Sequence, residues 1–302
     1  MYYPFVSVAV CTLNRKNLLR RCLNGLFNLN YPKSKYDIIV IDGGSTDGTV
    51  NMLKNEFPNV KIYLEKRVGV SHARNKALEL ANGDFIAFTD DDCVVTKDWL
   101  YYLVTSFSSP RIGAVGGPVR FLYHEKIPCK LLVKAALGGY DLGEKEMFVR
   151  FLITANIVIR REIFQHIKFE TILGRMGNML FDNEDVEFCE RMLKMGYHLL
   201  YNPKAIVYHD IDLKKRVNMK YILTRAVYSG ISLHIMKTKG FPSNADLFRS
   251  TIRHTGGAFF LFLRERTVEN FYFLVRNLTS CFASLASPFI TQKMRKTSTT
   301  RR

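Results

Sequence analysis

The stretch that decides the fold is Phe85–Cys93 (FIAFTDDDC), in which an apolar run leads directly into three consecutive aspartates. The turn sequence Asn82–Asp84 comes before it, and a helix-like segment comes after it. A short apolar run that is bounded in this way is typical of a buried strand. The sequence therefore predicts a buried strand that carries Asp90–Asp92 at its carboxyl end.

Three like charges at the end of a buried strand repel one another unless a cation lies among them. Mg²⁺ and Mn²⁺ prefer oxygen ligands, and Mg²⁺ usually takes one or two protein carboxylates together with phosphates. Ligands of open α/β sheets bind at the carboxyl ends of the strands. We therefore expect a Mg²⁺ or Mn²⁺ site at Asp90–Asp92. The alternative is a solvated acidic turn or a helix N-terminus, where negative charge is favourable.

Strand-like and helix-like segments alternate along the first third of the chain. The β-branched and apolar runs at 5–10, 37–41 and 60–64 predict strands, and helical periodicity follows the first two. A further helix is expected over about 71–81, just before the acidic strand. This alternation predicts a mostly parallel, doubly wound sheet.

The turn after the second predicted strand, Asp42–Gly48 (DGGSTDG), faces the same crevice as the aspartates in such a sheet. Its glycines permit close approach of the backbone to a ligand, so Asp42 is expected to contact a ribose or a base. Asp47 is expected to cap a helix. The sequence has neither G-x-G-x-x-G nor G-x-x-x-x-G-K-[ST], which argues against a dinucleotide fold and a P-loop.

The chain of 302 residues is long enough for one large domain with an appendage, or for two domains. Its six cysteines form no C-x-x-C pair, which indicates a reduced, cytoplasmic setting. No secretory signal is expected. The longest apolar runs of the C-terminal part, 258–263 and 271–275, are shorter than the ~18 residues that span a bilayer.

Positive charge is concentrated at the C-terminal end. Residues 214–302 hold 17 lysines and arginines against three acidic residues, a net charge of +14 out of the total of +17. We expect an α/β domain at 1–213, then basic amphipathic helices at 214–302 with a disordered tail. Such helices favour peripheral attachment to an anionic membrane surface, here on the inner face. The alternatives are packing on the core, or nucleic-acid binding, for which no motif is present.

Several segments together resemble the family 2 glycosyltransferases of GT-A fold. They are 8–15 (VAVCTLNR), 40–49 (VIDGGSTDGT), 73–75 (ARN) and 88–92 (FTDDD), and the resemblance covers roughly residues 5 to 210. It implies a GT-A core, Rossmann-like with a mostly parallel sheet flanked by helices. It also implies an inverting transfer of sugar from a nucleotide-diphosphate donor with Mg²⁺ or Mn²⁺.

The resemblance also assigns residues to the donor site. Asp90 and Asp92 form the Asp-x-Asp element for metal and diphosphate, and His209 ends a strand where the family carries a histidine near the metal. The family often has a second acid or an asparagine where this chain has Gly43. Arg74 is implied to support the nucleotide, and the alternative is that it is a solvated side chain on an exposed helix face. The nucleotide contacts implied in this way are Thr12, Asn14, Arg15, Asp42, Arg74, Asp90 and Asp91.

A helix is predicted to start near Phe181 and to end at Gly196, which serves as its C-cap. By resemblance, Glu184 and Asp185 are the family's catalytic pair, with Asp185 as the general base that accepts a proton from the acceptor hydroxyl. Glu184 would orient the acceptor or the donor. The alternative is that both carboxylates only complement the positive end of the helix dipole.

Two further residues are candidates for contact with donor or acceptor. Asn156 lies in the apolar segment 151–159, which is near the donor sugar in the resembling family. Its alternative role is that of a hydrogen-bonded polar residue in the core. Arg191 is a candidate for phosphate contact, or for an ion pair with Glu187 one turn earlier.

The leading hypothesis is a metal-dependent inverting glycosyltransferase that acts on a glycan or a lipid-linked acceptor. A second hypothesis is a nucleotidyltransferase that makes a nucleotide sugar; the lack of a Gly-rich N-terminal loop ending in Arg or Lys argues against it. A third is a non-enzymatic protein that binds membrane or RNA through the basic region 214–302.

Overall fold

The computed structural model describes residues 3–122, 139–210, 216, 218–239, 275 and 278–279. Most of the expected basic helical region, including the tail that we expect to be disordered, lies outside these residues. The strands are β1 (Val6–Thr12), β2 (Tyr36–Asp42), β3 (Lys61–Leu64), β4 (Phe85–Asp90), β5 (Cys93–Val95), β6 (Ile112–Gly116), β7 (Val119–Leu122), β8 (Met147–Val149), β9 (Ile157–Arg160), β10 (His198–Tyr201) and β11 (Val207–Asp210).

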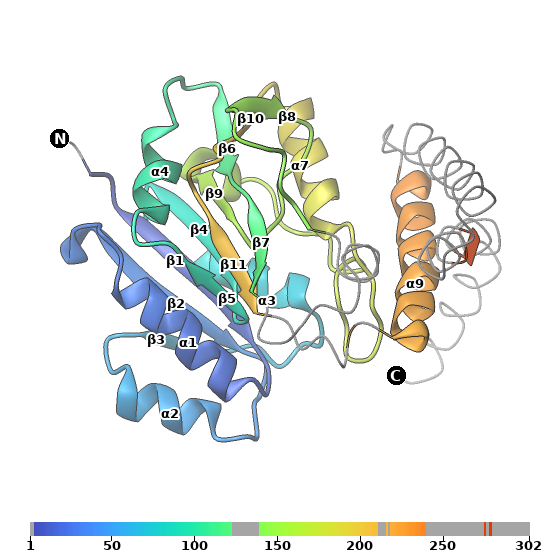
Figure 1. Ribbon diagram of the computed structural model, residues 1–302, viewed down its shortest axis with the longest axis horizontal. Coiled ribbons are helices and arrows are strands. Elements are labelled where there is room, and N and C mark those ends of the chain that lie inside the picture. Colours follow the sequence, from blue (N-terminus) through green and yellow to red (C-terminus); the bar gives the residue numbers. More distant parts are fainter. Residues whose placement is uncertain are drawn as a thin grey trace. The chain divides into compact units, whose positions relative to one another are not determined.

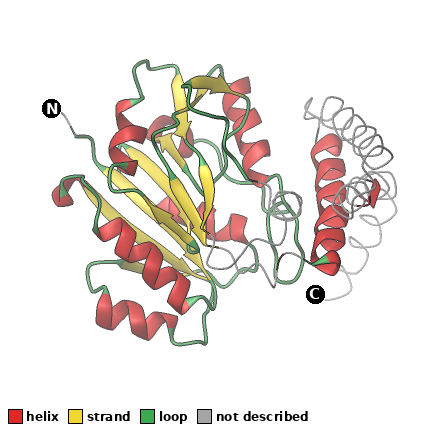
Figure 2. Ribbon diagram, viewed as in Figure 1, coloured by secondary structure: helices red, strands yellow, loops and turns green. Residues whose placement is uncertain are grey.

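Helices connect these strands (Figures 1 and 2). They are α1 (Lys16–Phe27), α2 (Thr49–Glu56), α3 (Val70–Leu80), α4 (Trp99–Thr105), α6 (Arg161–Phe164), α7 (Glu184–Lys194) and α9 (Met219–Thr238), with a short 3₁₀ turn η1 at Lys33–Lys35. The four predicted strands up to residue 90 and the helices between them lie within a few residues of their expected places. Gly196 has a φ of +86°, as expected for the residue that ends α7.

Eight of the described strands form one sheet in the order β3-β2-β1-β4-β9-β6-β10-β8. The pairs β2–β3, β1–β2, β1–β4 and β6–β10 are parallel. Strand β9 runs antiparallel to both of its neighbours, β4 and β6, and β8 runs antiparallel to β10. The prediction of a mostly parallel sheet flanked by helices is confirmed. The antiparallel strand β9 at the centre of the sheet was not predicted.

A second, three-stranded sheet has the order β5-β11-β7 and was not predicted. It begins where the chain leaves the first sheet: β4 ends at Asp90, and β5 starts directly after Asp91 and Asp92. Strand β11 pairs antiparallel with β5, with His209 opposite Cys93, and the Asp210 amide donates to the Asp92 carbonyl over 2.7 Å. The small sheet therefore brings the segment that ends at Asp210 back to the aspartates.

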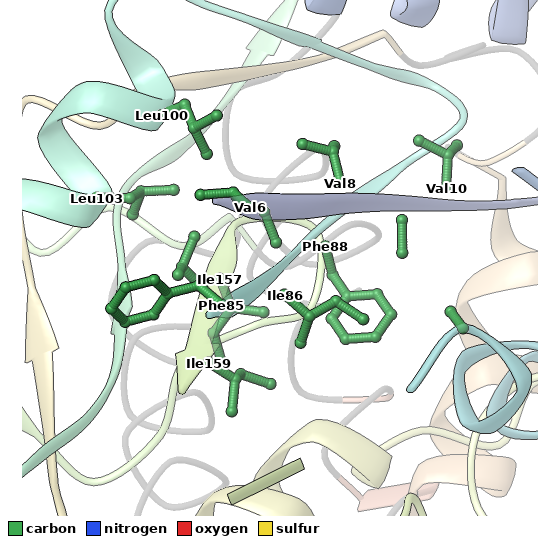
Figure 3. Packing of buried hydrophobic residues seen from close by; sticks show 14 of the residues in the cluster. Val6, Val8, Val10, Phe85, Ile86, Phe88, Leu100, Leu103, Ile157 and Ile159 are labelled. Atoms are coloured by element: carbon green, nitrogen blue, oxygen red, sulfur yellow. The ribbon is translucent and has the colours of Figure 1, made fainter. Parts of the chain in front are cut away.

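The core of the large sheet fixes the strands that carry the site. Val6, Val8 and Val10 of β1 are fully buried, as are Ile86 and Ala87 of β4. Figure 3 shows Leu100 and Leu103 of α4 close to the Val6 end of β1. Burial of each large aliphatic side chain contributes about 1.5–3 kcal/mol, so the carboxyl ends of β1 and β4 are held by a rigid framework.

The described residues fall into two compact units. One holds 3–122, 139–172 and 184–210, and the other holds 173–183 together with 216, 218–239, 275 and 278–279. In the second unit the Phe181 ring packs edge-on against Tyr228 of α9 at 4.9 Å, and the Asp182 amide donates to Ser232 Oγ over 3.1 Å. In the described part of the chain, no helix combines the length and the hydropathy needed to cross a bilayer.

Candidate active site

The carboxyl end of β4 carries the three aspartates, and a cation from the chain itself lies among them. Arg15 Nη1 donates to Asp91 Oδ1 and to Asp92 Oδ2, both over 2.8 Å. Asp91 and Asp92 are each 4% exposed. Burial raises the pKa of Asp91 to about 6, although the guanidinium of Arg15 acts in the opposite direction. Of the residues predicted to contact nucleotide, Arg15 and Asp91 are thus brought together.

Two further predicted nucleotide residues, Thr12 and Asp42, end the neighbouring strands β1 and β2 opposite each other. Thr12 Oγ1 donates to Asp91 Oδ2 over 2.8 Å, which joins them to the aspartates. Asp42 Oδ2 accepts the amides of Gly44 and Ser45, each at 2.9 Å. The other oxygen, Oδ1, is buried and has no hydrogen-bond partner among the described residues. Asp42 therefore retains an acceptor for a ligand.

Asn14 and Asp47 fix the shape of the turn after β2. Asn14 has a φ of +54°, and its Oδ1 accepts the Thr46 amide over 2.7 Å. Asp47 accepts the amide of Thr49 at the start of α2 and that of Lys16 at the start of α1, both over 3.0 Å. Asp47 thus accepts the first amide of each helix, but the N-cap of α2 is Gly48, so the predicted cap position is off by one residue. Asn14 braces the turn that carries Asp42.

Arg74 of α3 bridges two acidic segments that are far apart in sequence. Its Nη1 donates to Glu184 Oε1 over 2.6 Å, and its Nη2 lies 3.4 Å from Asp90 Oδ1. The side chain is 7% exposed, and its guanidinium lies 5.7 Å from the centre of the Phe169 ring. The alternative of a solvated arginine is therefore wrong, whereas contact between Arg74 and a nucleotide stays a prediction.

The predicted catalytic pair opens helix α7. Glu184 and Asp185 both lie in its first turn and are half-buried. Glu184 is tied to Arg74, and Asp185 Oδ1 accepts the Val186 amide over 2.8 Å. The structure thus connects the first turn of α7 to Asp90 through Arg74, and the role of Asp185 as a base stays a prediction.

His209 of β11 lies against the end of the aspartate run. Its Nε2 is 2.9 Å from Asp92 Oδ1, but no described residue forms an aligned hydrogen bond with Nε2. Asp92, Cys93 and His209 form a group whose potential ligand atoms lie within 4.8 Å of one another. Asp90, which we predicted as a metal ligand, is outside this group. Cys93 was not among the predicted ligands. Its position directly after the aspartates is the sequence feature that could have indicated it.

The donor atoms at this point fit a divalent cation. A carboxylate oxygen of Asp92 and an imidazole nitrogen of His209 face each other without a hydrogen bond between them. Carboxylate oxygens suit Mg²⁺ and Mn²⁺, and imidazole suits the first-row transition metals.

Asn156 makes its hydrogen bonds inside the core. It is fully buried, and its Oδ1 accepts Trp99 Nε1 over 2.8 Å. Its Nδ2 donates to the carbonyls of Pro118 and Ala205 over 3.0 and 2.7 Å. These contacts match the alternative role of Asn156, that of a polar residue in the core whose side chain is fully hydrogen-bonded.

Arg191 forms the ion pair that we considered as its alternative role. Its Nε and Nη2 donate to the two carboxylate oxygens of Glu187, each over 2.7 Å. The guanidinium also lies 5.4 Å from the centre of the Phe188 ring. Nη2 also donates to the Lys168 carbonyl, so the guanidinium is engaged both within α7 and with the segment before it.

A comparison with protein-family models gives a match to Glycosyl transferase family 2 over residues 7–168, which is more than half of the chain. The chain belongs to this family. Within the family, glycosyltransferase AglE of Haloferax volcanii is 30% identical over 216 residues, which cover 68% of this chain and 67% of AglE. The chain is accordingly a glycosyltransferase.

Two further matches cover more of the chain at lower identity. A dolichyl N-acetyl-alpha-D-glucosaminyl phosphate 3-beta-D-2,3-diacetamido-2,3-dideoxy-beta-D-glucuronosyltransferase of Methanococcus voltae is 23% identical and covers 93% of this chain and 91% of that protein. Among solved structures, mannosyltransferase PcManGT from Pyrobaculum calidifontis, in complex with GDP-Man and Mn²⁺, matches with a TM-score of 0.63 and 20% identity. The match covers 95% of this chain and 87% of PcManGT. The family 2 core of this chain has the GT-A fold.

Proposed function

We propose that this family 2 enzyme transfers a sugar, with inversion and with the aid of a divalent metal, from a nucleotide-diphosphate donor to an acceptor hydroxyl. The observation that carries the proposal is the convergence of acidic residues at one edge of the sheet. Asp42 ends β2 next to Thr12, Thr12 binds Asp91, and Asp92 faces His209. These residues come from four separate segments of the chain.

The nucleoside half of the donor is assigned to the ends of β1 and β2. Asp42 has a buried oxygen without a partner in the described chain, and such an acceptor suits a ribose hydroxyl or a base N–H. Its other oxygen is fixed by the amides of Gly44 and Ser45, so the free acceptor has one orientation. Asn14 acts on the same turn by bracing it.

The diphosphate half is assigned to the aspartates and to Arg15. Asp92 and His209 would hold Mg²⁺ or Mn²⁺, with Asp90 as a further candidate ligand. When bound, such an ion offsets the negative charge that develops on the leaving nucleoside diphosphate. Arg15, one-third exposed and already among these carboxylates, offers guanidinium donors that suit a phosphate oxygen.

Asp185 is proposed as the general base. It lies in the first turn of α7, where the helix dipole favours its ionised form. Glu184, directly before it, is held by Arg74, which also approaches Asp90. This arrangement supports a role for Asp185 near the donor, where a carboxylate accepts the hydroxyl proton as the acceptor oxygen attacks the anomeric carbon.

For the acceptor we propose a lipid-linked sugar. The name of the Methanococcus voltae relative specifies a dolichyl phosphate sugar, and 93% of this chain aligns with that protein. The net charge of +14 in residues 214–302 supports attachment to an anionic membrane surface from the cytoplasmic side.

Analysis of the products tests the reaction type. Purified full-length enzyme is incubated with Mn²⁺, a panel of nucleotide sugars and a polyprenyl-phosphate-linked sugar in detergent. We expect release of a nucleoside diphosphate and a product whose anomeric configuration, read by NMR, is opposite to that of the donor. Release of pyrophosphate would instead indicate nucleotidyl transfer, and a retained configuration would contradict inversion.

A further inference from the structure

A thiol belongs to the group of side chains that faces the proposed metal position. Asp92, Cys93 and His209 offer a carboxylate oxygen, a sulfur and an imidazole nitrogen within 4.8 Å of one another. Mg²⁺ and Mn²⁺ make no use of a sulfur ligand, since they prefer oxygen. The proposed reaction therefore leaves the chemistry of Cys93 unexplained.

The strands hold these three residues in place before any ion binds. Cys93 and His209 are directly opposite each other in the antiparallel pair β5–β11. The amide of Asp210 donates to the carbonyl of Asp92 over 2.7 Å, which extends the same ladder by one residue. Cys93 is fully buried and Asp92 is 4% exposed. The group is thus part of a rigid sheet and has no mobile surface residue in it.

A sulfur, a nitrogen and an oxygen together are the ligand types of a zinc site with one open position. Ligand bonds of ~2.0–2.3 Å place tetrahedral ligands roughly 3.5 Å apart, so side-chain movements of about 1 Å would close the group around an ion. We propose that Asp92, Cys93 and His209 form a binding site for Zn²⁺. On binding, the sulfur of Cys93 coordinates Zn²⁺ as the thiolate, and its proton passes to the buffer.

The site has a consequence for regulation, which rests on the proposed function. Zn²⁺ bound there occupies Asp92 and His209, the same groups that would hold Mg²⁺ or Mn²⁺. Divalent zinc also binds nitrogen and sulfur ligands more strongly than Mn²⁺ does. Zn²⁺ is therefore an inhibitor that competes with the catalytic ion, and Cys93 sets the sensitivity to it.

Co²⁺ is a spectroscopic probe for this site that is independent of sugar transfer. Full-length enzyme is titrated with Co²⁺ alone, and the near-ultraviolet charge-transfer absorption of a thiolate–cobalt bond is recorded. We expect one such bond per chain and its loss when Zn²⁺ displaces Co²⁺. The absorption should disappear in Cys93→Ser, with Zn²⁺ affinity reduced at least about tenfold.

The matched control is Cys22→Ser. Cys22 is also buried, and its Sγ lies 3.5 Å from the Asp90 carbonyl, but it is outside the group. It should keep the absorption. Binding of Co²⁺ without the thiolate absorption, or an absorption that survives in Cys93→Ser, would overturn the proposal.

A measurement on the unsubstituted enzyme covers the case in which Cys93→Ser fails to fold. The chain is alkylated in mild urea with and without Zn²⁺, and modified cysteines are located by peptide mass spectrometry. We expect Zn²⁺ to slow alkylation of Cys93 by at least about tenfold relative to Cys189, which is buried on α7 and outside the group. Equal protection of both thiols would contradict a site at Cys93. Neither readout depends on whether the enzyme transfers sugar.

Discussion

Arg74 and Glu184 stand 110 positions apart in the sequence, and Arg74 Nη1 donates to Glu184 Oε1 over 2.6 Å with both side chains largely excluded from solvent. The pair joins α3, which packs on β1 and β2, to the first turn of α7. Because Arg74 Nη2 also approaches Asp90, one guanidinium connects the donor side of the proposed site to the residue before the proposed base. This connection makes the pair a structural element of the site.

Replacing Arg74 by methionine should destabilise the enzyme strongly. Glu184 would be left with a poorly solvated charge and without its partner, a change that typically costs about 3–5 kcal/mol. Urea unfolding of the full chain measures the loss. Arg20→Met is the control, because Arg20 forms an exposed pair with Glu56 and its loss should leave the midpoint nearly unchanged. Equal midpoints for Arg74→Met and Arg20→Met would contradict a structural role for the buried pair.

Asn156→Ala should act on stability and leave donor binding intact. It removes the partners of Trp99 Nε1 and of the Pro118 and Ala205 carbonyls in a fully buried place, and we expect a loss of roughly 3 kcal/mol. KM for the donor should stay close to that of the wild type. Asn30→Ala is the control, since Asn30 makes an exposed hydrogen bond to Asp98. A raised KM with unchanged stability would instead identify Asn156 as a substrate contact.

Much of the framework could be predicted because it depends on local pattern. The apolar run of β4, the turn at Asp42 and the C-cap at Gly196 each have a signature within a few residues. The reversed direction of β9 and the pairing within the small sheet β5-β11-β7 have none, because each depends on partners that lie 41 to 116 residues away in the sequence. For the same reason, the sequence could not show that Arg74 is buried against Glu184.

Tyr201 should make stability depend on pH in the alkaline range. It is fully buried, its hydroxyl lies 3.2 Å from Asp141 Oδ1, and burial raises its pKa to about 12 from an ordinary value of 10.0. A raised pKa in the folded state means that the neutral form stabilises the fold below pH 10, and that this contribution is lost as the pH rises toward 12. Unfolding free energies over this range should fall less steeply in Tyr201→Phe. Parallel curves for the two proteins would reject the assignment.

Gly43→Asp should change nucleotide preference without unfolding the protein. A β-carbon at Gly43 would lie 3.4 Å from Leu13 Cδ1, and Leu13 is half exposed and free to shift. The new carboxylate would stand beside Asp42 and add an acceptor for a base N–H. We expect the ratio of affinities for nucleoside diphosphates with different bases, measured by calorimetry, to change.

The control for this substitution is Gly44→Asp. Gly44 has a φ of +92°, so an aspartate there is strained and should cost about 1 kcal/mol or more of stability. Loss of folding in Gly43→Asp, or an unchanged affinity ratio, would count against placing the nucleoside at this turn.

The central claim is that separate acidic segments hold one nucleoside diphosphate together with a divalent ion. Calorimetric titration of the full chain with GDP or UDP, with and without Mn²⁺, tests it most directly. We expect binding that requires Mn²⁺, and an affinity at least roughly tenfold weaker in both Asp92→Asn and Asp42→Asn. Asp98→Asn, which alters the exposed contact with Asn30 and keeps a residue suited to the N-cap of α4, should bind as the wild type does. Equal binding without Mn²⁺, or undiminished binding in Asp92→Asn, would contradict the account.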